Sequence, residues 1–239
     1  MKVLLLAAGL GTRLRPLTDK TPKCLVPICG KPLLGIWLDL LKDLPNVEFI
    51  INTHYLADQV QSFVNKHPLR NKITLIHEEK LLGTGGTILK NKNLLNSGES
   101  FWVIHADNLA KFEPIDFLKA HENKPTDCIM TMMTFKTDSP SSCGIVEVNA
   151  KGVLTSFHEK VPTPPGDQAN AAVYIFENEV LRILDSVNRD VVDLSLDIIP
   201  KLIGKIFTYK NEVYLRDIGT LEQFEKSQKD YINFFILKK

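Results

Sequence analysis

Short apolar segments alternate with amphipathic segments through the first half of this 239-residue chain, and this alternation constrains the fold more than any other feature. The apolar segments have the length of buried strands, and the segments between them have the spacing of helices that bury one face. Repeated strand–helix–strand units build a mostly parallel sheet. The predicted strands are 3–7, 47–51, 73–77 and 101–105, and the predicted helices are 33–44, 57–65 and 85–95.

The pattern becomes mixed after Pro114, where strands without intervening helices indicate antiparallel additions to the sheet. Segment 161–167 holds three prolines and a glycine, so we expect an exposed loop there. We therefore predict a single α/β domain over 1–239, with a Rossmann-like three-layer α/β/α fold, a mostly parallel central sheet and added antiparallel strands in the second half. The later elements are strands at 128–135, 144–148, 153–157 and 171–176, a turn at 149–152 and a helix at 221–235.

The charge balance argues against large anionic partners. Lys and Arg number 29 and Asp and Glu number 28, so no global field favours nucleic acid or an anionic membrane, and we expect neither as a partner. The N-terminal apolar run is too short to span a membrane. The four cysteines form no CxxC pair, so we expect reduced thiols in a cytoplasmic protein, although the sequence leaves a disulfide between two of them open.

Glycine and basic residues are concentrated in the loop after the first strand. Gly9 and Gly11 would let the backbone approach a phosphate closely, and Arg13 and Lys23 supply cations that could neutralise a triphosphate. The standard phosphate motifs do not fit, since a dinucleotide fingerprint would have Gly at Leu14. On the glycine and charge pattern alone, a tight turn with solvated basic residues is an equal alternative.

The run AAGLGTRLRPLT, followed by PKCLVP and then KP, resembles the signature of the sugar nucleotidyltransferases, the pyrophosphorylases that make nucleotide-activated sugars. The resemblance implies that residues 1–113 mainly bind a nucleoside triphosphate and residues 114–239 mainly bind a sugar 1-phosphate. It also implies catalytic roles for Arg13, which would grip the departing pyrophosphate, and for Lys23, which would contact the phosphates at the reaction centre. The nucleotide-binding residues that it implies are Ala8, Gly9, Gly11, Thr12, Leu82, Gly83 and Thr84.

Asp107 and Asp217 resemble the metal ligands of the same family. Each follows a strand-like apolar run, and ligands collect at the carboxyl ends of strands in open α/β sheets. The resemblance implies one Mg²⁺ held by both carboxylates. Asp217 could instead cap the final helix. His105 departs from the family's wording, and we expect a packed or hydrogen-bonded histidine rather than a metal ligand.

Three segments of the second half resemble the sugar-binding side of the family, in the expected order. Val161 and Ala172 stand where the family usually has Pro and Gly, which leaves the shape of the pocket open. The sugar-phosphate-binding residues that the resemblance implies are Gly144, Glu159, Lys160 and Asn170.

We predict a nucleotidyltransferase that converts a nucleoside triphosphate and a sugar 1-phosphate into a nucleotide sugar and pyrophosphate. The LGTGG form at 82–86 and the short chain look closer to guanylyltransferases acting on mannose or heptose 1-phosphate, so we favour GTP. Glu78 and Glu79 could accept from a guanine amino group, although exposed carboxylates are more often merely solvated.

Two alternatives stay open: a uridylyltransferase acting on a cell-wall amino sugar 1-phosphate, and a non-catalytic nucleotide-sugar sensor of the same fold. Many relatives carry an added C-terminal domain, and because this chain ends after the final predicted helix, we expect it to catalyse the transfer without one. The sequence leaves the oligomeric state open, a homo-oligomer included.

Overall fold

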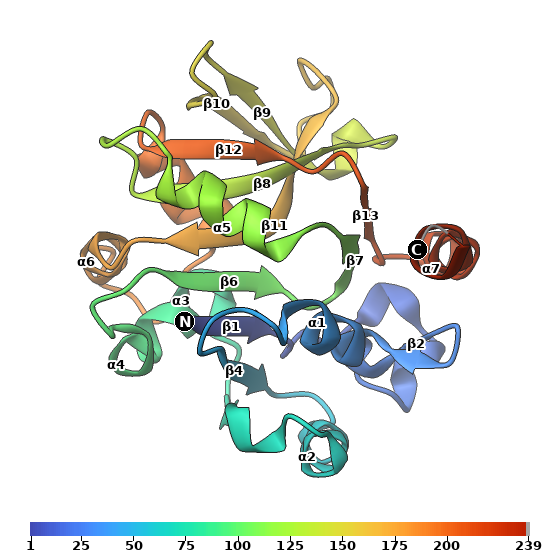
Figure 1. Cartoon of the computed structure of the whole chain (residues 1–239). Helices are drawn as coiled ribbons and strands as arrows, with labels where there is room; N and C mark the ends of the chain where they lie inside the picture. Colours follow the sequence, from blue (N-terminus) through green and yellow to red (C-terminus); the bar gives the residue numbers. More distant parts are fainter. Residues whose placement is uncertain (238–239) are drawn as a thin grey trace.

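Four parallel strands from the first half of the chain form one side of a large sheet in the computed structural model, which describes residues 1–237. β1 (Lys2–Leu6) lies between β4 (Glu48–Thr53) and β6 (Phe101–His105), and β5 (Ile73–His77) lies beyond β4. The predicted parallel sheet is therefore confirmed, with strand ends that differ from the predicted ones by at most two residues. The carboxyl ends of β1 and β6 point to the same side of the molecule (Figure 1).

The second half extends this sheet mainly with antiparallel strands, as predicted. β11 (Gln168–Phe176) pairs antiparallel with β6 and also with β8 (Met130–Lys136), while β9 (Gly144–Val148) pairs antiparallel with β10 (Leu154–Glu159). β12 (Ile206–Lys210), which the sequence did not predict, pairs parallel with β8. The order along the main path is β10-β9-β11-β6-β1-β4-β5.

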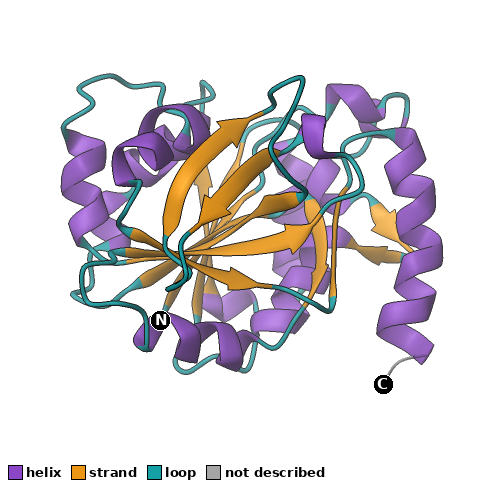
Figure 2. Cartoon of the chain, turned by 90° about the horizontal axis from the view of Figure 1, so that it is seen from above, coloured by secondary structure: helices purple, strands orange, loops and turns teal. Residues whose placement is uncertain are grey.

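Helices cover both faces of the sheet, and the alternation of side chains along β1 shows why. Val3 and Leu5 are buried in one core with α1 (Leu33–Leu41) and α2 (Ala57–Lys66), and α5 (Pro114–Glu122) packs on the same core. Leu4 faces the opposite core, formed with α3 (Gly83–Lys90), α6 (Glu179–Asp185) and the helical turns Leu194–Ile198 and Ile199–Leu202. This arrangement confirms the three-layer α/β/α fold (Figure 2).

Several predicted helix boundaries were wrong. The predicted helix 85–95 begins at Gly83 and is divided into α3 and α4 (Lys92–Leu95) by Asn91, a residue type that favours caps and turns over helix interiors. The predicted helix 33–44 ends at Leu41, and 221–235 is α7 (Leu221–Tyr231) followed by the π-helical turn Ile232–Leu237. Short 3-10 helices lie at Thr12–Leu14, Leu17–Asp19, Lys23–Leu25, Arg70–Lys72 and Pro140–Ser142.

Two small ribbons, which the sequence did not predict, lie beside the carboxyl ends of the parallel strands (Figure 1). β2 (Pro27–Ile28) pairs with β3 (Lys31–Pro32), and β7 (Asn108–Lys111) pairs antiparallel with β13 (Tyr214–Asp217). A third apolar core packs α7 against both ribbons; its members include Leu14, Ile28, Leu109, Tyr214, Ile218 and Phe224. The β7–β13 pairing therefore brings the end of the chain back to the strand that follows β6.

Among residues 1–237, no helix has the length and apolar character needed to cross a bilayer. All four cysteines are unpaired thiols.

His121 is a buried titratable group that links α5 to the sheet. Its Nδ1 lies 2.8 Å from the Thr131 hydroxyl on β8, and its Nε2 lies 3.1 Å from the Glu177 carboxylate. Burial, and then the nearby charge of Lys124, lowers the pKa of His121 to about 4, although Glu177 opposes this shift. The ring is therefore neutral in the folded protein near pH 7.

We predict that His121 makes the protein less stable in mild acid. Because an unfolded histidine titrates near a pKa of about 6.5, the unfolded chain takes up a proton before the folded chain does. The free energy of unfolding should therefore decrease as the pH falls from about 6.5 towards 4, by an amount on the order of 2 kcal/mol. Urea unfolding of the wild type and of His121→Gln over this range measures the effect. An equal pH dependence in both proteins would contradict it.

Candidate active site

A buried lysine joins two carboxylates that are far apart in the sequence. The Lys23 ammonium donates to Asp107 Oδ2 at 2.7 Å and lies 3.9 Å from Asp217 Oδ1. Lys23 is only 7% exposed, so the alternative of a merely solvated basic residue is wrong for this lysine. Burial alone would raise the pKa of Asp107, but the Lys23 charge and hydrogen bond outweigh it, and the pKa lies below its usual value. Asp107 is therefore ionised at neutral pH.

The two ribbon strands explain how these side chains meet. Asp107 lies in the turn between β6 and β7, and Asp217 ends β13, where it pairs with Asn108 of β7. Gly219 completes the arrangement, because a Cβ there would lie 2.9 Å from Asp217 Oδ2 and 3.1 Å from the Arg13 guanidinium. Glycine at this position thus allows Arg13 to lie beside Asp217.

The same carboxylates suit a divalent metal ion. In the described chain no three His, Cys, Asp or Glu side chains gather closely enough to hold a metal by themselves. Mg²⁺, however, is commonly held by one or two carboxylates together with substrate phosphates, and convergence on a single ammonium shows that Asp107 and Asp217 can share one cation. The alternative role of Asp217 as a helix cap is excluded, since the Thr220 hydroxyl caps α7 by accepting from the Gln223 amide.

A first cavity, of about 240 Å³, lies beside Lys23 and Asp107 and is lined in part by the predicted nucleotide-binding loop. Ala8 and Gly9 line it, and a Cβ added to Gly9 would meet no protein atom within 4 Å, so packing does not explain this glycine. Gly11 has a different role: its φ is 65°, and a Cβ there would lie 2.9 Å from the Thr18 methyl, so the turn requires glycine. Thr12 is exposed in that turn. Of the predicted loop residues, Ala8 and Gly9 thus lie at the cavity itself.

The LGTGG segment lines this cavity on one side and packs against the chain at 190–192 on the other. Gly83 and Thr84 line the cavity, and their contact with a nucleotide stays a prediction. A Cβ on Gly83 would lie 2.5 Å from the Val192 carbonyl oxygen, and one on Gly86 would lie 2.3 Å from that of Asp190, so these glycines are also needed for packing. The backbone of Leu82 is engaged within the protein, since its carbonyl accepts from Val192 N at 3.0 Å.

Glu78 is a buried carboxylate at the wall of the first cavity, only 2% exposed. The alternative of a merely solvated carboxylate is therefore wrong for Glu78. Its Oε1 accepts from Asn52 Nδ2 at 3.0 Å and from the Thr87 hydroxyl at 2.6 Å, whereas Oε2 has only a long contact, 3.4 Å, from Leu82 N. Asn52 Oδ1 in turn accepts from the Ala7 amide at 2.7 Å. One Glu78 oxygen thus keeps capacity to accept from a ligand.

Asn52 and Thr87 were not predicted as site residues, although the sequence carries a signal for Asn52. It is a polar residue at the carboxyl end of the parallel strand β4, which is where ligands gather in such sheets. Thr87 lies inside α3 and carries no comparable signal.

A second cavity, of about 180 Å³, adjoins the same pair of carboxylates. All four predicted sugar-phosphate residues line it, together with Arg13, Asp107 and Asp217. The Lys160 ammonium lies 3.1 Å from Glu159, and a Cβ on Gly144 would lie 2.5 Å from Phe157 and 2.6 Å from Glu159. The structure therefore brings the predicted residues of both halves together, while their roles stay predictions. The four predicted sugar-phosphate residues that line this cavity are Gly144, Glu159, Lys160 and Asn170.

His105 lies between the two cavities and lines both. It packs edge-on against Tyr174, with ring centroids 6.3 Å apart, and its Nε2 is buried without a hydrogen-bond partner in residues 1–237. Burial lowers the pKa of His105, so the ring is neutral near pH 7. These observations favour a packed histidine.

Asn170 and Ala172 shape the second cavity through an irregularity in β11. The register of β11 with β8 shifts between Asn170 and Tyr174, and Asn170 spans the shift by accepting from Ala172 N at 2.9 Å and donating to the Tyr174 hydroxyl at 2.7 Å. Ala172 has a φ of 54°, in the left-handed region that favours glycine. Alanine at position 172, where the family usually has glycine, therefore adds backbone strain but does not change the course of β11.

We predict that Ala172→Gly stabilises the protein. A left-handed conformation costs a residue with a Cβ roughly 1–2 kcal/mol, and glycine removes most of that cost, so the free energy of unfolding should rise by about 1 kcal/mol. Ala171→Gly is the matched control, because Ala171 has no positive φ and is buried, and this change should lower stability. Chemical denaturation of both variants measures the effect. Equal destabilisation by the two would contradict the strain assigned to Ala172.

The sequence is similar to those of known nucleotidyltransferases. The sequence model of a family described as nucleotidyl transferase matches residues 2–233. The chain is 29% identical over 238 residues to a mannose-1-phosphate guanylyltransferase catalytic subunit beta of Dictyostelium discoideum, and the match covers 98% of this chain and 65% of that protein. It is 30% identical to a mannose-1-phosphate guanylyltransferase of Mycobacterium tuberculosis, with 96% and 64% covered. The chain thus spans less than two thirds of the length of these relatives.

Solved structures show the same architecture. HddC from Yersinia pseudotuberculosis, crystallised in complex with GMP-PN, has a TM-score of 0.78 and 26% identity, and the match covers 96% of this chain and 99% of that one. A putative glucose-1-phosphate thymidylyltransferase from Bacillus anthracis has a TM-score of 0.84 at 19% identity, covering 96% and 94%, which supports the fold alone.

Proposed function

Because the chain belongs to the nucleotidyl transferase family, we propose that it joins a nucleoside triphosphate to a sugar 1-phosphate and releases pyrophosphate. One observation carries this proposal: Asp107 and Asp217 meet at the Lys23 ammonium, between a cavity lined by the glycine loop and a cavity lined by side chains suited to hydroxyls and phosphate. An oxygen of the sugar phosphate forms a bond to the α-phosphorus, and the bond from that phosphorus to the pyrophosphate oxygen breaks. The electron pair leaves with pyrophosphate.

The residues act by position and charge, since the attacking phosphate oxygen is already anionic near neutral pH and needs no base. Lys160 would bind the sugar phosphate, with Glu159 and Asn170 accepting from or donating to the sugar hydroxyls. Arg13 would hold the departing pyrophosphate. Lys23, buried and held by its ion pairs, would stabilise the negative charge that develops at the α-phosphate.

Nucleotidyltransferases of this family generally use a divalent metal ion. For this chain we propose Mg²⁺, with Asp107 and Asp217 as its protein ligands, because a pair of carboxylates suits this hard cation. When bound, it would screen the repulsion between the two phosphate groups.

GTP is the nucleotide that the first cavity suits best. Guanine presents adjacent N–H donors on its N1 and N2 edge, and the free oxygen of the buried Glu78 can accept from them. Uracil presents carbonyl oxygens on either side of its one N–H, which a carboxylate would repel. The relatives named mannose-1-phosphate guanylyltransferase, and the neighbour crystallised with GMP-PN, support the same choice of nucleotide. The names of these relatives also support a mannose-type acceptor. A heptose-type acceptor is implied by the motif resemblance of the LGTGG segment.

The alternatives make different predictions. A uridylyltransferase acting on an amino sugar 1-phosphate would release pyrophosphate from UTP, and a non-catalytic sensor would release none from any nucleotide. Pyrophosphate release from each nucleoside triphosphate, with Mg²⁺ and a panel of sugar 1-phosphates, therefore tests the proposal directly. A cytoplasmic location and the absence of nucleic-acid and membrane partners stay predictions, as does self-association.

We predict that Glu78→Gln changes the choice of base. Gln keeps an oxygen to accept from Asn52 and Thr87 but replaces the second oxygen with an amide group, which disfavours the guanine donors and suits a uracil carbonyl. The ratio of kcat/KM for GTP to that for UTP should fall by about 100-fold or more. Glu79→Gln, on the neighbouring exposed residue, is the matched control and should leave the ratio unchanged. A wild-type ratio in Glu78→Gln would show that Glu78 does not select the base.

We predict that Lys23→Met lowers kcat by about 10²- to 10³-fold, because it removes a buried charge next to the reacting phosphates. Lys20→Met, at an exposed lysine of the same loop, is the control and should retain normal turnover. Since Lys23 also pairs with Asp107, thermal unfolding should be followed in parallel to establish that both variants are folded. Normal turnover in folded Lys23→Met would remove its assigned role.

A further inference from the structure

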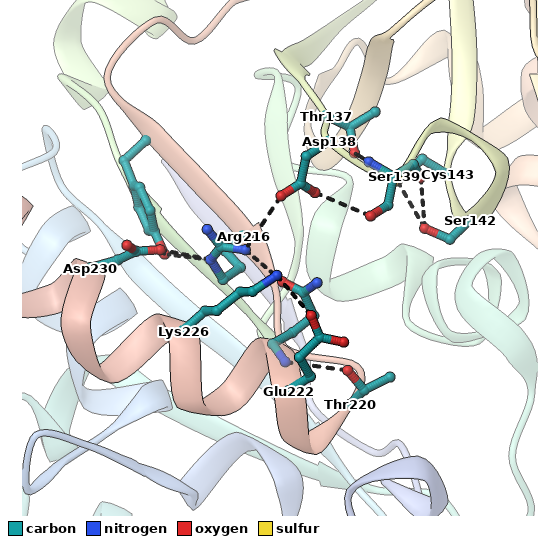
Figure 3. A network of polar contacts seen from close by, with 12 residues as sticks. Thr137, Asp138, Ser139, Ser142, Cys143, Arg216, Thr220, Glu222, Lys226 and Asp230 are labelled. Carbon is teal, nitrogen blue, oxygen red and sulfur yellow. Dashed lines mark hydrogen bonds and ion pairs between the residues drawn. The ribbon is translucent and has the colours of Figure 1, made fainter.

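A third cavity, of about 350 Å³, opens beside the sugar-side cavity. It lies between the loop 137–143, the strand β13 and the N-terminal end of α7, and Figure 3 shows the polar side chains around it. The two cavities share six lining residues, namely Arg13, Phe135, Ser142, Cys143, Leu215 and Asp217. The third cavity therefore adjoins the cavity that contains Glu159 and Asn170.

The walls of this cavity combine apolar and hydrogen-bonding groups. Phe135 and Leu215 provide apolar surface, while Asp138, Ser139 and Ser142 provide a carboxylate and two hydroxyls. The Asp138 side chain is 67% exposed and accepts from the Ser139 hydroxyl at 3.1 Å, which leaves its remaining lone pairs available. Carbohydrates present C–H faces and hydroxyl groups together, so this mixture suits a polyhydroxylated carbon chain.

Two of the cations around the cavity are engaged by carboxylates of the protein. Arg216 forms an ion pair with Asp230 at 2.7 Å and lies 4.0 Å from Asp138, and Lys136 lies 3.2 Å from Asp167. These two cations are therefore already balanced by carboxylates. Arg13, which also lines the cavity, belongs to the reaction centre described above.

The Arg216 network fixes the cavity wall in place. The guanidinium's bonds to Asp230 and to Gln223 Oε1, the latter at 2.5 Å, join β13 to α7, and it also donates to the Tyr214 hydroxyl at 3.3 Å within β13. Figure 3 shows Arg216 beside Asp230. Across the cavity, the Thr137 hydroxyl accepts from Ser139 N at 3.1 Å and holds the loop. A wall with fixed hydrogen-bonding groups can discriminate between ligands, because little conformational freedom is lost on binding.

We propose that this cavity is an acceptor subsite that receives the part of the sugar beyond its ring. The inference rests on the proposed function and makes its acceptor more specific: a sugar 1-phosphate of the heptose type, whose carbon chain continues past the sixth carbon. The terminal hydroxyls of that chain donate to Asp138 and contact the Ser139 and Ser142 hydroxyls, while its C–H groups lie against Phe135 and Leu215. A hexose 1-phosphate leaves these groups to solvent.

The test compares two acceptors, a mannoheptose 1-phosphate and mannose 1-phosphate, with GTP and Mg²⁺. The measured quantity is the ratio of their kcat/KM values, which should favour the heptose by about tenfold in the wild type, as expected for one or two added hydrogen bonds. Ser139→Phe fills the cavity, and Asp138→Asn removes the charged acceptor while keeping its shape. Each should bring the ratio close to one, mainly through KM for the heptose. Ser97→Phe, at an exposed serine on the loop before β6, is the matched control and should keep the wild-type ratio.

Two results would overturn the subsite. One is equal use of both acceptors by the wild type, and the other is a wild-type ratio in folded Ser139→Phe, with folding checked by thermal unfolding. Failure of the proposed function gives a different result, because no pyrophosphate would be released from any nucleotide with either acceptor. That result would also reject the subsite. A loss of stability in Asp138→Asn with an unchanged ratio would assign Asp138 a structural role and would also reject the subsite.

Discussion

The contact of one buried ammonium with two carboxylates organises this molecule. Lys23 comes from the loop after β1, Asp107 from the turn after β6 and Asp217 from the end of β13, so a single charge cluster ties three distant segments together. Each charge alone would be costly in this partly buried position, and together they are mutually stabilising. The cluster lies between the first and second cavities. It therefore connects segments of the fold and is also the proposed reaction centre.

Glycines near the centre have different physical reasons. Gly9 faces open space, which is consistent with close approach of a ligand, whereas Gly11 is needed for a turn and Gly86 for contact with the backbone at 190–192. Gly219 makes room for Arg13 beside Asp217. The glycines near the site therefore do not share one role. Some of its positions leave space for a ligand, and others hold the segments that surround it.

Specificity on both sides depends on polar groups that the protein holds in place. Glu78 is fixed by Asn52 and Thr87, so its free oxygen points in one direction, and the Arg216 network fixes the wall opposite Asp138 in the same way. The proposed base choice and the proposed acceptor choice thus share one physical origin. A hydrogen-bond acceptor that the protein holds in place strengthens the binding of a ligand with a correctly placed donor and weakens the binding of one that lacks it.

The parallel sheet and its helices could be predicted from the sequence, because short apolar runs such as β1 alternate with amphipathic segments, and this pattern depends on local spacing alone. The motif resemblance also indicated Lys23, Asp107, Asp217 and the sugar-side residues. The folded structure was needed to learn that Lys23 and Glu78 are buried, that the β7–β13 ribbon brings Asp217 to Asp107, and that Ala172 is left-handed. Burial and pairing between segments about 100 residues apart depend on how the whole chain packs, and the residues of either segment alone do not encode them.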